Sequence, residues 1–158
     1  MPKPKVKTEV YRDADDQYRW RVKSYNGKIL ADSGQGYKNL AIARNAFLAT
    51  WTHLHNVLNW EERPYGPMGN IRLVPGAIVE NAVKAPRIKV EVYRDIAGEY
   101  RWRVKHDNGH ILADSGQGYQ RIRIANDAIH TMWTHLSNVS EWGQKNYEGD
   151  IHLTPVVG

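Results

Sequence analysis

The chain has 158 residues, 41% hydrophobic and 25% charged, which is typical of a globular protein and excludes wholesale disorder. It contains no cysteine, which excludes disulfides and thiolate metal sites. The net charge of +5 and the pI near 9.4 favour an anionic partner such as nucleic acid.

An internal repeat organises the sequence. The stretch from Tyr18 to Tyr37 returns as Tyr100 to Tyr119, and residues 9–60 align with residues 91–142 without a gap, with about three in five positions identical. We therefore predict a first repeat at 1–74, a linker at 75–86 and a second repeat at 87–158. The linker is bracketed by prolines and carries few charges.

Each repeat begins with three predicted strands. Val6, Thr8 and Val10 alternate with polar residues, which is the period of a strand with one buried face. Tyr18, Trp20 and Val22 form the buried face of the next strand, followed by Asn26-Gly27, a strong signal for a type I′ hairpin turn. A third strand covers residues 29–32, so we expect an antiparallel meander.

A helix follows the meander in each repeat. Apolar residues recur at helical spacing over about five turns, with Asn39 as the expected N-cap in the first repeat and Arg121, which lacks a capping oxygen, in the second. After the helix, Trp60 and Trp142 lead through a turn into one short further strand. The expected helical stripes are Leu40, Ala43, Ala46, Phe47, Thr50, Leu54 and Val57 in the first repeat, and Ala125, Ala128, Ile129, Met132, Leu136 and Val139 in the second.

The predicted fold class is α+β, with tandem βββα(β) repeats, antiparallel sheets and one long helix per repeat. A single repeat buries little apolar area against the entropy of ordering it, and its meander leaves open edges. We therefore expect the two repeats to interlock about a pseudo-twofold axis and to form one compact domain.

These motifs resemble the YegP-like family of small uncharacterised bacterial and archaeal proteins. The resemblance is carried by Tyr18–Val22, Asn26-Gly27 and Ile29–Tyr37, and by their second copies from Tyr100 to Tyr119. It implies α+β units of three strands and a helix, occurring as tandem repeats or as single repeats that dimerise. The family has no established catalytic residues, and we predict no cofactor. The lengthened helices and the segments after them depart from the family pattern, and we interpret them as marks of a phage-borne or assembly-specific role.

Cations of the second strand in each repeat are candidates for binding a nucleic-acid backbone. The alternative is a solvated strand face, on which Glu9, Glu91, Asp13 and Asp95 pair with these cations, and we favour this alternative. The candidate cations are Arg19, Arg21, Lys23, Arg101, Arg103 and Lys105.

The glycine-rich segment before each helix is a candidate anion site, and Arg121 and Arg123 strengthen it in the second repeat because cations there oppose the helix dipole. We favour the alternative of a tight turn that needs glycine, fixed by Asp32 and Ser33. His53 and His135 match between the repeats, and Asp32, Ser33 and His53 suggest a catalytic triad. However, adjacent Asp and Ser side chains diverge in a strand, and no nucleophile elbow surrounds Ser33. We therefore predict no catalytic residue and no metal site.

Four tryptophans at the helix margins and ends, namely Trp51, Trp60, Trp133 and Trp142, either bury the additional strand or bind a partner. We predict a non-enzymatic binding or assembly module, with a protein partner or self-association, and keep nucleic-acid binding as the alternative. No segment has the length of a membrane helix and no secretory signal is expected. The expected location is the cytoplasm, or the virion if the protein is phage-borne.

Overall fold

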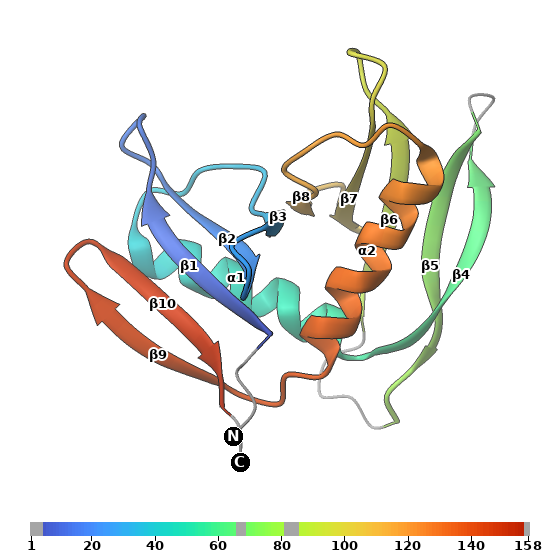
Figure 1. The fold of residues 1–158 in the computed structure, drawn as a ribbon. Helices are drawn as coiled ribbons and strands as arrows, with labels where there is room; N and C mark the ends of the chain where they lie inside the picture. Colours follow the sequence, from blue (N-terminus) through green and yellow to red (C-terminus); the bar gives the residue numbers. More distant parts are fainter. Residues whose placement is uncertain (1–4, 66–68, 81–85, 157–158) are drawn as a thin grey trace.

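The computed structural model describes residues 5–65, 69–80 and 86–156. The predicted α+β class is confirmed, because in these residues two helices accompany one antiparallel sheet of ten strands (Figure 1). The elements in chain order are β1 (Val6–Arg12), β2 (Tyr18–Ser24), β3 (Ile29–Asp32), α1 (Leu40–His55), β4 (Val57–Tyr65), β5 (Asn70–Ile78), β6 (Ile88–Arg94), β7 (Tyr100–His106), β8 (Ile111–Asp114), α2 (Ile122–Ser137), β9 (Trp142–Tyr147) and β10 (Asp150–Pro155).

The meander of β1, β2 and β3 forms as predicted, but its second turn differs from the expected type. The amide of Gly27 donates to the Ser24 carbonyl at 2.9 Å, and Gly27 has a φ of 89°. Asn26 does not have the positive φ that a type I′ turn requires, since among the described non-glycine residues only Asp16 has one. The hairpin therefore closes with a type I-like turn that ends at a left-handed glycine.

The predicted helix caps are confirmed. The Asn39 side chain accepts a hydrogen bond from the Ile42 amide at 2.9 Å, whereas Arg121 makes no side-chain capping bond. Helix α1 ends at His55, so Val57, which we expected on the helical stripe, instead begins β4 and is buried there.

The prediction of one strand after each helix is wrong, because each helix is followed by a two-stranded hairpin. Trp60 lies within β4 and pairs with Pro75 of β5, and Trp142 pairs in the same way with Pro155 of β10. Strand β5 continues to Ile78, so residues 75–78 of the expected linker are strand, held by pairing with the start of β4. Residues 81–85 of that segment lie outside the described residues.

The strand order of the sheet is β4-β5-β6-β7-β8-β3-β2-β1-β10-β9. Strand β5 of the first half pairs with β6 of the second, where Ile71 faces Val92, while β10 of the second half pairs with β1 of the first, where Val10 faces Ile151. Each half thus contributes a hairpin to the strands of the other half. In the middle of the sheet, β3 and β8 meet through one residue pair, Asp32 and Asp114.

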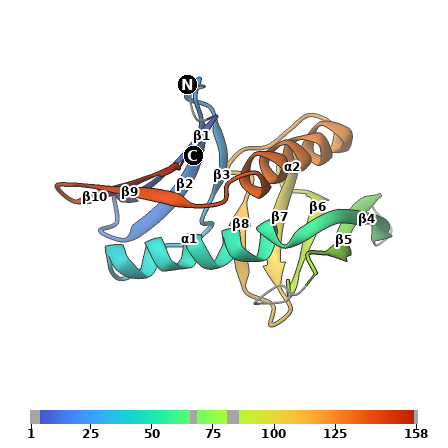
Figure 2. The ribbon, with the colours of Figure 1, turned by 90° about the horizontal axis from the view of Figure 1, so that it is seen from below.

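The core lies between the sheet and the two helices. Trp20 and Trp102, both predicted core residues, are 1% and 0% exposed. Helix α1 covers β1 and β2, and α2 covers β6 and β7. In Figure 2, α1 lies below the strands on the left and α2 lies above the strands on the right. The strand faces that the helices leave uncovered therefore point in opposite directions in the two halves. Within the described residues, neither helix is long and apolar enough to cross a membrane.

The C-terminal ends of the helices are joined by reciprocal hydrogen bonds from tryptophans. The Trp51 indole Nε1–H donates to the Leu136 carbonyl at 3.0 Å, and the Trp133 Nε1–H donates to the Leu54 carbonyl at 3.2 Å. Each bond goes to a carbonyl in the last turn of a helix, which also accepts from a backbone amide just after the helix, Val139 for Leu136 and Asn56 for Leu54.

Replacing Trp51 with phenylalanine should lower the free energy of unfolding by about 0.5–1.5 kcal/mol, because an aromatic ring still fills most of the space while the indole bond to the Leu136 carbonyl is lost and the Val139 amide still donates to that carbonyl. Denaturant unfolding followed by circular dichroism measures this change, with Trp133→Phe as the matched variant. If both variants unfold at the wild-type midpoint, the indole bonds do not contribute to helix docking.

Candidate functional site

The six candidate cations of β2 and β7 lie beside carboxylates of the neighbouring strands and turns. The Arg19 Nε is 2.6 Å from Asp13, and the Arg21 Nε is 2.8 Å from Glu9, which is also 3.5 Å from the Lys23 ammonium. The second half repeats this arrangement, with Arg101 2.6 Å from Asp95, and Arg103 and Lys105 2.8 and 3.7 Å from Glu91. All six cations therefore have an acidic partner.

The carboxylates at the centre of these clusters are buried. Burial alone would raise the pKa of Glu9, but the hydrogen bond with Arg21 and the charges of Arg21 and Lys23 outweigh it and lower the pKa to about 2. The pKa of Glu91 is lowered by Arg103 and Lys105 against the same effect of burial. The cations therefore neutralise carboxylates inside the protein, which leaves less of their charge for an external anion.

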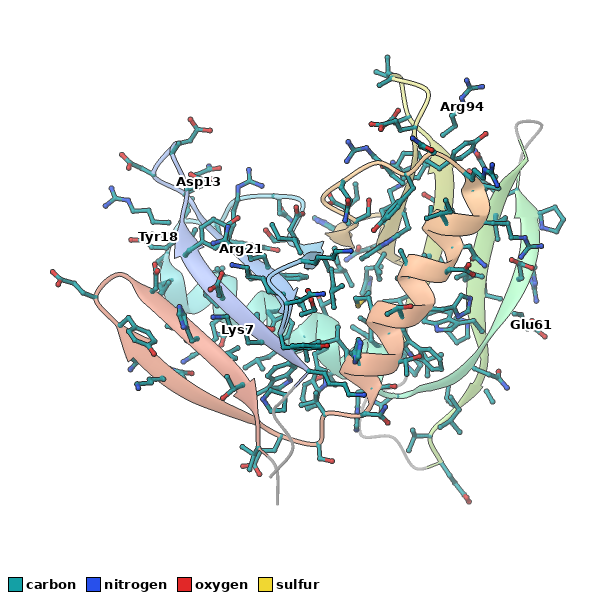
Figure 3. The ribbon with its side chains drawn as sticks, in the orientation of Figure 1. Lys7, Asp13, Tyr18, Arg21, Glu61 and Arg94 are labelled. Atoms are coloured by element: carbon teal, nitrogen blue, oxygen red, sulfur yellow. The ribbon has the colours of Figure 1, made fainter. Side chains whose placement is uncertain are left out.

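The two cation clusters face different directions. In Figure 3, Lys7, Asp13 and Arg21 all lie in the left-hand lobe, with Asp13 towards its upper tip. Their strand face is opposite Trp20, which packs against Phe47 of α1. Because the helices cover opposite sides in Figure 2, the corresponding face of β7 points the other way. One straight nucleic-acid backbone would therefore not follow both clusters.

Replacing Glu9 with glutamine should lower the stability at neutral pH by about 2 kcal/mol, because Arg21 loses its charged acceptor. A carboxylate with a lowered pKa contributes stability above its unfolded pKa near 4.5, and this contribution is lost as the pH falls towards about 2. The difference between wild type and variant should shrink over that range in acid unfolding curves. A difference that stays constant down to about pH 2 would contradict the lowered pKa.

The glycine-rich segment before each helix forms the predicted tight turn. Gly34 has a φ of 70° and its amide donates to Asp32 Oδ1 at 2.9 Å, while the Ser33 hydroxyl donates to the Gln35 carbonyl at 2.7 Å. Gly116, Asp114 and Ser115 make the same contacts in the second half. The Gly34 and Gly116 amides are therefore already satisfied within the turn. Arg121 and Arg123 are exposed, and no ion pair joins either to a described acidic residue.

Sequence reasoning missed the pairing of Asp32 with Asp114 across the β3–β8 junction. A Cβ placed on Gly116 would lie 2.9 Å from Asp32 Oδ2, and one on Gly34 would lie 3.0 Å from Asp114 Oδ2, so each carboxyl reaches into the turn of the other half. Burial, the hydrogen bond with Asp114 and the Asp114 charge raise the pKa of Asp32 to about 7. The only available signal was that both turns carry Asp at the strand end.

The histidines occupy structural positions. His53 is buried, its Nδ1 accepts a hydrogen bond from the Arg87 amide at 3.3 Å, and its ring lies 5.5 Å from that of His106. His55 Nδ1 lies 3.0 Å from the Ser137 carbonyl, and burial together with the Lys5 charge lowers the pKa of His135. The structure therefore places His53 at the start of β6, whereas Asp32 lies at the β3–β8 junction. Within residues 5–65, 69–80 and 86–156, no group of three His, Cys, Asp or Glu side chains is arranged to hold a metal ion.

The four candidate tryptophans are half-buried and pack against the core. The Trp142 ring lies 5.2 Å from Phe47 and 6.2 Å from Trp51, and the Trp60 ring lies 6.2 Å from Trp133. These contacts attach the β9–β10 hairpin to α1 and the β4–β5 hairpin to α2. The rings thus fill the interfaces of the additional hairpins, and little of their surface remains for a partner.

The outer strands β4 and β9 leave two open edges of the sheet, and the ladder shows which main-chain groups face outward. The Val156 amide donates to the Glu141 carbonyl at 2.9 Å, and hydrogen-bonded pairs alternate with unbonded pairs along an antiparallel ladder. This alternation directs the amides and carbonyls of Trp142, Gln144 and Asn146 away from β10 and towards solvent. Side chains 144–147 are exposed.

The edge of β4 differs from the edge of β9 at one outward-facing position. The Asp107 amide donates to the Arg87 carbonyl at 2.9 Å, so Arg87 and Asp107 are a hydrogen-bonded pair. Bonded and unbonded pairs then alternate from β7 through β6 and β5 to β4. This alternation directs the main-chain groups of Trp60, Glu62 and Pro64 on β4 away from β5. Proline has no amide hydrogen, so the β4 edge is interrupted where the β9 edge carries Asn146. In Figure 3, Glu61 marks this edge at the far right.

The ten-stranded sheet and the two matching glycine turns before the helices define an α+β protein with a repeated strand and turn motif. Residues 13–46 and 95–136 match the model of the Domain of unknown function (DUF1508). The predicted resemblance to the YegP-like family is confirmed, because two segments of the chain match the model of this domain and the solved structures of similar fold are the yegP and UPF0339 proteins described next.

Two solution NMR structures share the fold. The protein of unknown function yegP from E. coli is 14% identical with a TM-score of 0.51, covering 82% of this chain and 84% of its own. The UPF0339 protein SO3888 from Shewanella oneidensis is 13% identical with a TM-score of 0.54, covering 85% and 86%. No curated protein matches the chain.

Proposed function

We propose that the chain is a non-enzymatic module for binding or assembly, and that it acts through the edges of its sheet. The observation that supports this proposal is the open edge of β9, where the outward main-chain groups of Trp142, Gln144 and Asn146 have no strand beside them among the described residues. An exposed strand edge is a template for pairing with another extended segment. The buried His53 and the carboxylates of Glu9 and Glu91, by contrast, have structural partners, which supports a role without catalysis.

We further propose that residues 1–74 and 87–158 are tandem repeats related by a pseudo-twofold axis, that the segment 75–86 joins them and extends β5 as far as Ile78, and that they fold as one domain. Three matched features support this arrangement: the exchanged hairpins, the reciprocal indole bonds of Trp51 and Trp133, and the facing carboxyls of Asp32 and Asp114. The two repeats supply strands to each other, so neither contains its whole sheet.

The proposed function is tested by comparing the proteins that wild type and a Gln144→Pro variant capture from the native lysate. Proline at position 144 removes an outward amide without breaking a bond to β10. We expect at least one protein to be captured by wild type and by the matched Glu62→Pro variant of β4, but not by Gln144→Pro. Capture that is the same for all three chains, or absent for all three, would contradict binding through β9.

Nucleic-acid binding through the cations remains the alternative, and the ion pairs with Glu9, Glu91, Asp13 and Asp95 count against it. We expect no retention of DNA or RNA at physiological salt. Affinity that falls steeply with salt, and that is lost when Arg19, Arg21, Arg101 and Arg103 are replaced with Glu in a chain that still folds, would support this alternative instead.

A further inference from the structure

We propose that the open edge of β9 binds the same edge of a second copy of this chain, in antiparallel orientation and centred on Gln144. This inference rests on the proposed function and names the partner. Figure 1 shows β9 at the outer margin of the left-hand lobe, with β10 on its inner side. The sheets of two copies would then continue into one another across a twofold axis.

The direction of the main-chain groups determines how two β9 strands can align. Gln144 of one copy stands opposite Gln144 of the other, and Trp142 stands opposite Asn146 on each side of this centre. All of these residues have outward-facing amides and carbonyls, so each opposed pair exchanges two hydrogen bonds. Exposed side-chain amides of Gln144 and Asn146, which already bond to each other at 2.8 Å, line the same face.

Charge selects this alignment over the neighbouring one. Lys145 is the only charged residue of β9. An alignment centred on Lys145 would place the two ammonium groups directly opposite each other in an unbonded pair, where side chains are closest and like charges destabilise. Centring on Gln144 instead places Lys145 opposite Gly143 of the other copy. Gly143 has no side chain, and a Cβ at this position would meet only ordinary contacts, the nearest at 3.5 Å.

The other edge of the sheet limits the assembly to two copies. Pairing β9 of one copy with β4 of the next would form an open filament, but Pro64 provides no outward amide to such a ladder. The charges of Glu61, Glu62 and Arg63 further disfavour uncontrolled pairing at that edge. One open edge and one interrupted edge therefore favour a closed dimer.

Light scattering across a concentration series of the purified chain tests this proposal. The mass should rise from 18.2 kDa towards twice that value and no further. Gln144→Pro should weaken dimerisation by at least about tenfold, because the central pair loses its outward amides, whereas Glu62→Pro on β4 should dimerise like wild type. Circular dichroism spectra and thermal unfolding establish that each variant is folded.

A gain-of-affinity variant makes the test independent of any loss of folding. Gly143→Glu places a carboxylate opposite Lys145 of the other copy, twice per dimer, and should tighten dimerisation by about twofold or more. A wild-type mass of one copy at every concentration, a mass that rises beyond two copies, or a Gly143→Glu chain that dimerises no more tightly would overturn the proposal. A monomeric chain that still captures a different protein through β9 overturns only self-pairing and leaves the proposed function in place.

Discussion

Replacing Phe47 with alanine should destabilise the protein by about 3–5 kcal/mol, which is the cost of removing a fully buried phenylalanine ring. Phe47 is 0% exposed, and its ring lies 5.2 Å from Trp20 of β2 and 5.2 Å from Trp142 of β9. It therefore joins a helix of the first half to a hairpin of the second half. The cavity would loosen this interface as well as remove apolar contacts.

Chemical denaturation measures this loss, and hydrogen exchange locates it. We expect the amides of β10 and β1 to lose protection together in the Phe47→Ala variant, because β10 pairs with β1. Ile42→Ala on the same helix is the control, since Ile42 is 45% exposed and its truncation should cost less than about 0.5 kcal/mol. A Phe47→Ala chain within about 1 kcal/mol of wild type would show that the additional hairpin does not depend on this ring.

The stability of the wild-type chain should contain a contribution that decreases as the pH rises through about 7, and Asp32→Asn should remove it. An acid whose folded pKa is raised above its unfolded value near 3.8 contributes stability that is fully present below about pH 4 and is lost as the pH passes the folded pKa. At about 1.4 kcal/mol per pH unit between the two pKa values, the contribution is at most about 4 kcal/mol. Arg19 moderates it, because its charge favours the ionised carboxyl.

The physical reason lies in the β3–β8 junction. With one proton between them, Asp32 and Asp114 share a hydrogen bond, whereas two carboxylates directly opposite each other repel. Asparagine at position 32 keeps an amide donor towards Asp114 and an oxygen for the Gly34 amide, and it does not titrate.

Unfolding curves of wild type and Asp32→Asn between about pH 5 and about pH 8.5 provide the comparison, because the wild type should lose this contribution as the pH rises to about 7 and level off above it. Other groups, including His135 with its lowered pKa, titrate in both chains and cancel in the difference. Asp15→Asn, an exposed carboxyl away from the junction, is the matched control. The same pH slope in wild type and Asp32→Asn would exclude the junction as its origin.

Local patterns in the sequence predicted most of the fold. The alternation of Val6, Thr8 and Val10, the helical stripe around Phe47 and the Asn39 cap all depend on neighbours within a few residues, and the structure contains them as expected. Trp20 and Trp102 were recognised as core because each lies on the apolar face of an alternating strand.

The features that could not be predicted from the sequence depend on pairing between segments that are distant along the chain. Strand β4 has exposed residues on both faces from Glu61 onwards, so it lacks the alternation by which a second strand after the helix would be recognised. The facing of Asp32 and Asp114 results from how β3 meets β8, which no local pattern encodes. The difference between the edges of β4 and β9 could also be recognised only from the strand pairing. Pro64 interrupts the β4 edge because its main chain faces outward, and this direction follows from the pairing and not from the sequence.

Each half receives a hairpin from the other half, so we expect the chain to unfold as one unit. Native-state hydrogen exchange of the intact chain over a range of low denaturant concentrations measures whether it does. We expect the slowest amides of β1 and β10, and those of β5 and β6, to converge on a single free energy of opening. Two separate free energies, one for the strands of residues 1–74 and another for those of residues 87–158, would show that the two halves unfold independently.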